Sequence, residues 1–240
     1  MQFVSKHLDV FLSAPIEPQG PVGRAPAAWL ATVAKLDARC MPLIEASPRL
    51  FHERHSRETL RRFYLATEVT SLECFVACMA WGGMRYDHGA QALQARQQWL
   101  GLISKVRTSI LPREELFEKF LALRPDQLPH VGIAYFTKLL HFLRRGPDAY
   151  ILDQWTAKSV NLLTGRGVVH LMGNWVDDSN TARGYEKFCT VIECLSERMR
   201  EHYKRPFEGG EAERALMSHG GRNPGTWRKY LKANWLPAPR

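Results

Sequence analysis

Apolar positions recur at helical spacing over much of this chain of 240 residues. The clearest run follows a period of 3.6 residues and consists of Tyr185, Phe188, Cys189, Ile192, Leu195 and Met199. This pattern predicts one long amphipathic helix from about Asn180 to Tyr203. Alternating β-branched runs, which are typical of half-buried strands, are weak, and only residues 3–11 and 168–171 suggest strands. We therefore expect a mostly α-helical protein.

A second helix carries its own start and stop signals. Residues 70–73 (Thr-Ser-Leu-Glu) match a capping box, and Gly82-Gly83 supplies a stop. The residues between these signals are almost wholly apolar, so we expect this helix to be buried. Residues 15–26 hold four prolines and two glycines and should form a loop. Further segments with helical signals are residues 57–67, residues 91–107 and the stretch after Pro112.

Composition narrows the class of protein. A hydrophobic content of 45% suits a buried core, and there is no apolar run long enough for a membrane span. Residues 1–14 lack a secretory signal pattern, and five cysteines without a CxxC spacing favour a reducing cytosol. The formal net charge of +9 favours an anionic partner such as nucleic acid.

A proline and a glycine frame a tight turn within residues 128–138 (Leu-Pro-His-Val-Gly-Ile-Ala-Tyr-Phe-Thr-Lys). Pro129 should end a short preceding helix, and Gly132 should supply the positive φ that such a turn demands. The helix that starts near Ile133 would direct unpaired N–H groups out of the turn, where they suit a phosphate oxygen. An ordinary corner between two helices uses the same residues, so the turn alone leaves both interpretations open.

A carboxylate follows this turn at Asp153, within Ile-Leu-Asp-Gln-Trp (residues 151–155). The pattern Leu-Pro-Gly-Val-Gly-x-Lys of the helix-hairpin-helix DNA glycosylase superfamily is matched by Leu128, Pro129, Val131 and Gly132. His130 replaces the first glycine of that pattern. Asp153 lies nineteen positions after Ala134, and this spacing most resembles that of the 8-oxoguanine DNA glycosylases. An aspartate that only caps the next helix is the alternative.

The resemblance implies a multi-helix, two-lobed glycosylase-like fold and a base-excision chemistry. Asp153 would stabilise the oxocarbenium-like transition state of glycosidic bond cleavage. Ala134 stands where the family has its Schiff-base lysine, and Lys138 lies one turn further along the helix. Lys138 is therefore our candidate nucleophile and β-lyase residue; if it is structural, Asp153 acts with water alone. The residues expected to contact the DNA backbone are His130, Gly132, Ile133 and Ala134.

An extruded base needs a pocket with aromatic faces and polar edges. The residues that we assign to this pocket are Trp81, Tyr86, Asp87, His88, His141 and Trp155. Trp81 also fits the core, and Asp87-His88 a solvated turn. Basic and aromatic residues mix near the C-terminus, where they can grip DNA or pack on the core. These residues are Tyr203, Lys204, Arg205, Arg222, Trp227, Arg228, Lys229, Tyr230, Lys232 and Trp235.

No metal site or cofactor is expected. Cys74 and Cys78 lie four residues apart in an apolar segment and suit the core, and an iron–sulfur cysteine spacing is absent. Glycine-rich phosphate loops and a GxSxG elbow are also missing.

These observations predict a DNA glycosylase that flips and excises a damaged or modified base from duplex DNA, with 8-oxoguanine as the first candidate. A modified cytosine of foreign DNA and an alkylated purine are alternative bases. The rival functions are a non-catalytic helix-hairpin-helix DNA-binding module and a protein–protein adaptor. We expect a cytoplasmic, nucleoid-associated monomer with an N-terminal arm and first helix (1–56), a helical core (57–205) and a tail packing on it (206–240).

Overall fold

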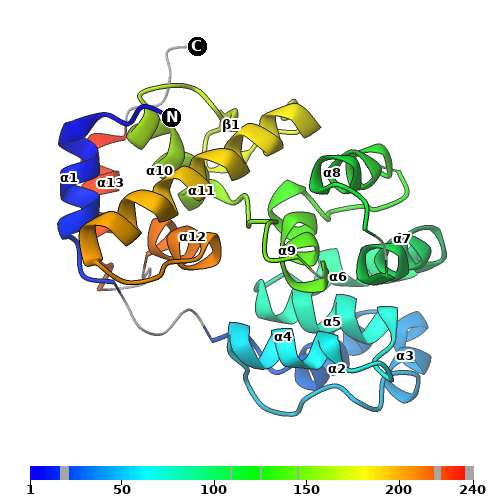
Figure 1. The fold of residues 1–240 in the computed structure, drawn as a ribbon. Helices are drawn as coiled ribbons and strands as arrows, with labels where there is room; N and C mark the ends of the chain where they lie inside the picture. Colours follow the sequence, from blue (N-terminus) through cyan, green and yellow to red (C-terminus); the bar gives the residue numbers. More distant parts are fainter. Residues whose placement is uncertain (17–21, 109, 125, 145, 219–222, 236–240) are drawn as a thin grey trace. The chain divides into compact units, whose positions relative to one another are not determined.

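The computed structural model describes residues 1–16, 22–108, 110–124, 126–144, 146–218 and 223–235. The described residues are mostly helical and include one small antiparallel sheet, which confirms the expected fold class (Figure 1). Of the expected loop at residues 15–26, residues 17–21 lie outside the described part of the chain.

The chain divides into two compact units. Unit 1 comprises Met1–Gly20 and Pro147–Arg240, and unit 2 comprises Pro21–Gly146. These bounds differ from the three segments expected from the sequence (1–56, 57–205 and 206–240), and that division stays a prediction.

Unit 2 is built around two apolar helices. Its helical segments are α2 (Pro26–Leu36), η1 (Ala38–Cys40), α3 (Pro42–Glu45), α4 (Arg57–Leu65), α5 (Ser71–Trp81), α6 (Tyr86–Gln94), α7 (Arg96–Thr108), α8 (Arg113–Ala122) and α9 (Ile133–Leu143). Helix α5 contacts α2, α4, α7 and α9, while α9 contacts α4, α5, α7 and α8. Every residue of α5 from Leu72 to Trp81 is buried, as its apolar sequence predicts. The helix that follows the Pro/Gly turn is thus a central helix of its unit.

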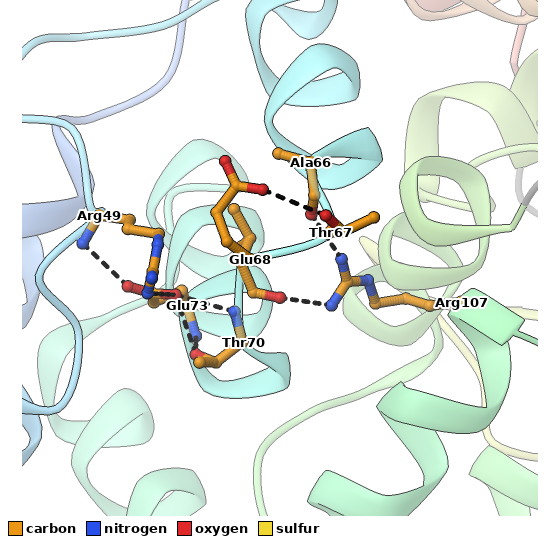
Figure 2. Close-up of polar contacts among 8 residues, drawn as sticks. Arg49, Ala66, Thr67, Glu68, Thr70, Glu73 and Arg107 are labelled. Atoms are coloured by element: carbon orange, nitrogen blue, oxygen red, sulfur yellow. Dashed lines mark hydrogen bonds and ion pairs between the residues drawn. The ribbon is translucent and has the colours of Figure 1, made fainter.

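The start of α5 is fixed by hydrogen bonds to the side chains of Thr70 and Glu73 (Figure 2). The Glu73 backbone N–H donates to Thr70 Oγ1 at 3.1 Å, and the Thr70 N–H donates to Glu73 Oε2 at 2.8 Å, so the predicted capping box is confirmed. The Glu73 side chain is fully buried and also accepts from the Arg49 N–H at 2.9 Å. Arg107 of α7 donates to the carbonyl of Ala66 at 3.0 Å. These bonds satisfy polar groups that would otherwise be buried without partners.

Unit 1 is built around the helix that follows Asp153. Its elements are α1 (Ser5–Ser13), α10 (Gln154–Thr164), β1 (Leu171–Met172), β2 (Trp175–Val176), α11 (Ala182–Tyr203), α12 (Gly209–Met217) and α13 (Thr226–Asn234). Helix α10 contacts α1, α11, α12, α13 and β2. Helix α13 packs on it through Trp227, which is 2% exposed and donates its indole N–H to Ser159 Oγ at 2.9 Å. The long helix predicted over residues 180–203 is confirmed by α11.

Two expected elements were wrong. Residues 3–11 do not form a strand, because residues 5–13 form α1, which packs on α10 and whose entry is held by the Val4 N–H donating to the carbonyl of Leu163 at 2.8 Å. Residues 91–107 are not one helix, because the chain breaks at Ala95 between α6 and α7. The break lets Trp99 enter the core, where it is fully buried and donates to the carbonyl of Ala92 at 2.9 Å.

No helix of the described residues is both long and apolar enough to cross a membrane.

Candidate functional site

The turn before α9 lies where the sequence predicts it, but its backbone conformation differs from the prediction. Residues 126–130 form turns rather than the short helix expected before Pro129. The residue with positive φ is His130, at 61°, whereas Gly132 has a φ of −65° and a ψ of 174°. The glycine of the family pattern at position 130 would adopt this left-handed backbone without strain, and here a histidine adopts it.

Gly132 is the N-cap of α9 and has no side chain with which to cap it. The first-turn N–H groups, which begin at Ile133 and Ala134, therefore point away from the helix without a side-chain acceptor from the N-cap residue. A Cβ added at Gly132 would meet nothing within 4 Å, so its surroundings leave room for a ligand to approach the backbone. This is the geometry expected of a phosphate contact.

His130 is exposed and lies against α6. Its ring stacks on that of His88 with centroids 4.3 Å apart, and its Nε2 is 2.7 Å from Gln91 Oε1. Burial, and then the neighbouring charge of His130, hold the pKa of His88 below its usual value. The structure thus joins a residue predicted for the base pocket to a residue predicted for the DNA backbone contact.

Lys138 is buried within α9 and is 7% exposed. Its Nζ donates to the carbonyl of Ala134 at 2.7 Å and lies 5.2 Å from the centroid of the Tyr135 ring. The ammonium therefore leans back by one turn toward the position where the family has its lysine. Lys138 belongs to unit 2, and Asp153 belongs to unit 1.

The other predicted pocket residues of unit 2 fall into separate contacts. Trp81 and His141 are both buried and both pack edge-on against Phe142, at 5.0 and 4.9 Å between ring centroids. Tyr86 lies under the guanidinium of Arg24, at 5.0 Å. The remaining member, Asp87, forms an ion pair of 2.7 Å with Arg85, which holds the pKa of Asp87 below its usual value.

The thiols of α5 are core residues, as predicted. Cys74 and Cys78 are fully buried, and burial raises the pKa of each to about 12. Within the part of the chain that the structure describes, no group of three or more His, Cys, Asp or Glu residues is placed to hold a metal ion.

In unit 1, Asp153 is the N-cap of α10, and only one of its carboxylate oxygens does the capping. Oδ1 accepts from the N–H groups of Trp155 at 2.8 Å and Thr156 at 3.0 Å. The half-buried carboxylate accepts no hydrogen bond at Oδ2 from the described residues. Asp153 therefore caps α10 with one oxygen, and its other oxygen has no hydrogen bond from the described residues.

Cations gather around Trp155, two residues after Asp153. The centroid of its ring lies 3.7 Å from the Arg228 guanidinium carbon, 5.1 Å from Lys158 Nζ and 5.8 Å from Lys232 Nζ. Burial, and then the charge of Arg228, lower the pKa of Lys158. We call these four residues the Trp155 cluster.

Lys158 was not predicted as a site residue, because a lysine within a helix carries no signal of its own. Arg228 and Lys232 were seen only as members of a basic tail, of which Arg222 lies outside the described residues.

Comparison with known proteins identifies the family. A family model described as "Putative 8-oxoguanine DNA glycosylase OGG-like protein" matches residues 17–216. No curated protein and no solved structure matches the chain significantly. Because the family model spans most of the sequence, the chain belongs to the OGG-like DNA glycosylase family.

Proposed function

We propose that this protein excises a damaged or modified base from duplex DNA, with 8-oxoguanine as the first candidate, and that Asp153 is its catalytic carboxylate. The observation that carries the proposal is that only one oxygen of the Asp153 carboxylate accepts hydrogen bonds from the described residues. Oδ1 is bound by the start of α10, which fixes the orientation of the side chain, while Oδ2 has no partner among the described residues. A carboxylate held in this way can face the positive charge that develops on the sugar as the base leaves.

A second proposed role belongs to Lys138. As the glycosidic bond breaks, its electron pair leaves with the base, and Lys138 Nζ forms a bond to C1′ of the sugar. Opening of the sugar ring gives an imine, and loss of a proton from C2′ then expels the 3′ phosphate, which nicks the strand. The lysine must be deprotonated to attack, and the carbonyl of Ala134 holds its Nζ at 2.7 Å, back toward the start of α9. If Lys138 has no such role, the enzyme is monofunctional and Asp153 acts with water.

The proposed DNA contact is the turn before α9. The N–H groups after Gly132 would hold a phosphate of the backbone, and the exposed His130 stands beside them. Phosphate contacts of this kind fix the position of the protein on DNA without reading sequence. In unit 2, Trp81, Tyr86, Asp87, His88 and His141 are the proposed base-pocket residues, and in unit 1 Trp155 is a proposed base contact.

The test is a panel of duplexes, each with one lesion or modified base (8-oxoguanine, an alkylated purine, a modified cytosine), incubated with protein and then treated with alkali to reveal abasic sites. We expect excision from one class of duplex. Asp153→Asn should lower that excision by about 100-fold or more, because the negative charge is lost. Asparagine caps helices as well as aspartate does, so the fold and the DNA affinity should be retained. Failure of wild-type protein to excise any base would favour the non-catalytic binding module.

A further inference from the structure

The hairpin of unit 1 presents an exposed apolar pair. Strands β1 and β2 are joined by Gly173 and Asn174, and Gly173 has a φ of 62°. Met172 pairs directly with Trp175, so their side chains lie on the same face of the hairpin. Met172 is 59% exposed and Trp175 is 66% exposed. The protein thus places a tryptophan and a methionine together in solvent, where they contribute little to the core.

Two buried asparagines hold the residues that lead into β1 of this hairpin. Asn161 of α10 donates to the carbonyl of Val169 at 2.7 Å and accepts from its N–H at 2.9 Å. Asn180 makes the same paired contact with His170, at 2.8 and 2.9 Å. Both asparagines are buried, at 7% and 4% exposed. A binding surface that is already ordered loses less conformational entropy when a ligand docks on it.

The turn of the hairpin is tied to the Trp155 cluster. Lys158 Nζ donates to Asn174 Oδ1 at 2.9 Å, and the same ammonium lies over the Trp155 ring. Arg228 and Lys232 complete the positive charge on that ring. The nearest acidic side chain of the hairpin, Asp177, turns back to accept from the Ser179 N–H at 2.8 Å. Lys158 and Arg228 are buried, at 7% and 5% exposed, whereas Lys232 is exposed. An exposed apolar pair near this positive charge is complementary to a ligand that has flat apolar faces and a negatively charged backbone.

We propose that Met172 and Trp175 form a nucleobase-stacking site, and that Lys232, the exposed cation of the Trp155 cluster, holds a phosphate beside it. Nucleic acid bases offer the flat faces, and phosphates the charge, that this arrangement complements. The inference rests on the proposed function, because it takes duplex DNA as the ligand. It adds a second DNA contact, on unit 1, to the one proposed for the turn before α9 on unit 2.

The site is tested with fluorescently labelled duplex DNA, whose anisotropy gives the affinity over a range of salt concentrations. Trp175→Ala should weaken binding by about tenfold, the loss typical of one base–aromatic stack, and Trp175→Phe should restore most of it. The slope of log affinity against log salt should stay unchanged in Trp175→Ala, because no phosphate contact is lost. Lys232→Gln should lower that slope by about 1.

A second readout reports on the bases themselves. A duplex that carries 2-aminopurine in an unpaired position should lose fluorescence when wild-type protein binds, because stacking on an aromatic ring quenches this base, and it should lose less with Trp175→Ala. Ile110→Ala is the control, because it removes an apolar side chain that is 95% exposed in the other unit. Equal affinity and equal quenching for wild type and Trp175→Ala would overturn the stacking site, while excision by wild type would leave the proposed function standing. Self-association or protein capture lost in Trp175→Ala at unchanged DNA affinity would also overturn it. If wild-type protein neither binds nor excises, both proposals fail.

Discussion

The rings of His88 and His130 lie 15° from parallel with their centroids 4.3 Å apart. This stack connects the first turn of α6 to the turn that precedes α9, and Gln91 adds a polar contact to the same His130 ring. The turn that we propose for phosphate binding therefore packs against His88, whose pKa is lowered in the folded protein.

Acidification should destabilise this contact. The pKa of His88 is lowered in the folded protein by burial and then by His130, with Arg85 acting in the same direction and Asp87 opposing it. The unfolded chain therefore binds the proton more tightly, and stability falls as pH drops from the ordinary histidine value near 6.5 through the lower folded value. Thermal unfolding between pH 7.5 and 5 should show a smaller fall for His88→Gln than for wild type. His7 and His55, whose pKa values are also lowered, stay in both proteins. Identical pH dependence in the two proteins would contradict the prediction.

The left-handed backbone of His130 predicts a difference between two small substitutions. Both His130→Gly and His130→Ala lose the stack on His88, but only alanine keeps a Cβ at a φ of 61°. The glycine variant should be more stable than the alanine variant by about 1 kcal/mol, because a Cβ clashes in this conformation. Urea unfolding of the two variants measures the difference. A more stable alanine variant would mean that the backbone changes when the ring is removed.

Gly132 should matter for DNA and not for the fold. Its φ of −65° suits any residue, and a Cβ there would meet nothing within 4 Å, so Gly132→Ala should change stability by less than about 0.5 kcal/mol. DNA affinity should fall several-fold, and equally for duplexes with and without a lesion, because the added methyl group stands where a phosphate approaches. Gly101→Ala is the matched control, since its Cβ is equally unobstructed. Unchanged affinity in Gly132→Ala would place the phosphate elsewhere.

Borohydride trapping decides the role of Lys138. If its amine attacks the sugar, reduction should give a covalent protein–DNA adduct with wild type, and Lys138→Arg should lose the adduct and the strand nick while keeping a positive charge. Lys105→Gln is the control, because Lys105 is an exposed lysine of the same unit with no proposed role. Lys158→Gln tests the other lysine that is 7% exposed, in the helix that follows Asp153. Loss of the adduct in Lys158→Gln alone would assign the nucleophile to Lys158. Excision without any adduct would make Lys138 a structural residue.

Periodicity and capping signals predicted the long helix α11, the buried helix α5 and the start of α9, because these features depend on neighbours within a few residues. The same reasoning chose the wrong residue for the positive φ. Glycine at 132 had the permissive backbone, but the turn uses position 130, where the family pattern has its other glycine. The break at Ala95 was missed because it serves the burial of Trp99 against Phe75, a contact that forms only in the folded unit.

The site was predictable only in part. Asp153 and the turn before α9 stand out locally, whereas the Trp155 cluster combines residues from α10 and α13 that are far apart in sequence. The exposed hairpin did have a signal, the Gly173-Asn174 pair between two short apolar segments, and the weak strand expected at residues 168–171 lies next to it.

The composition of unit 1 from two separate parts of the chain has a consequence for biosynthesis. Helix α1 is held by partners made much later, since the Val4 N–H donates to the carbonyl of Leu163 and His7 Nδ1 lies 2.8 Å from Tyr230 Oη. During translation α1 cannot dock until α10 and α13 have left the ribosome. Unit 2 is contiguous in sequence and can therefore fold earlier. Closing such a long loop slows the last step of folding. Unit 1, which carries Asp153, is therefore the last part of the molecule to be completed, and a nascent chain that has already folded unit 2 still lacks the carboxylate that we propose as catalytic.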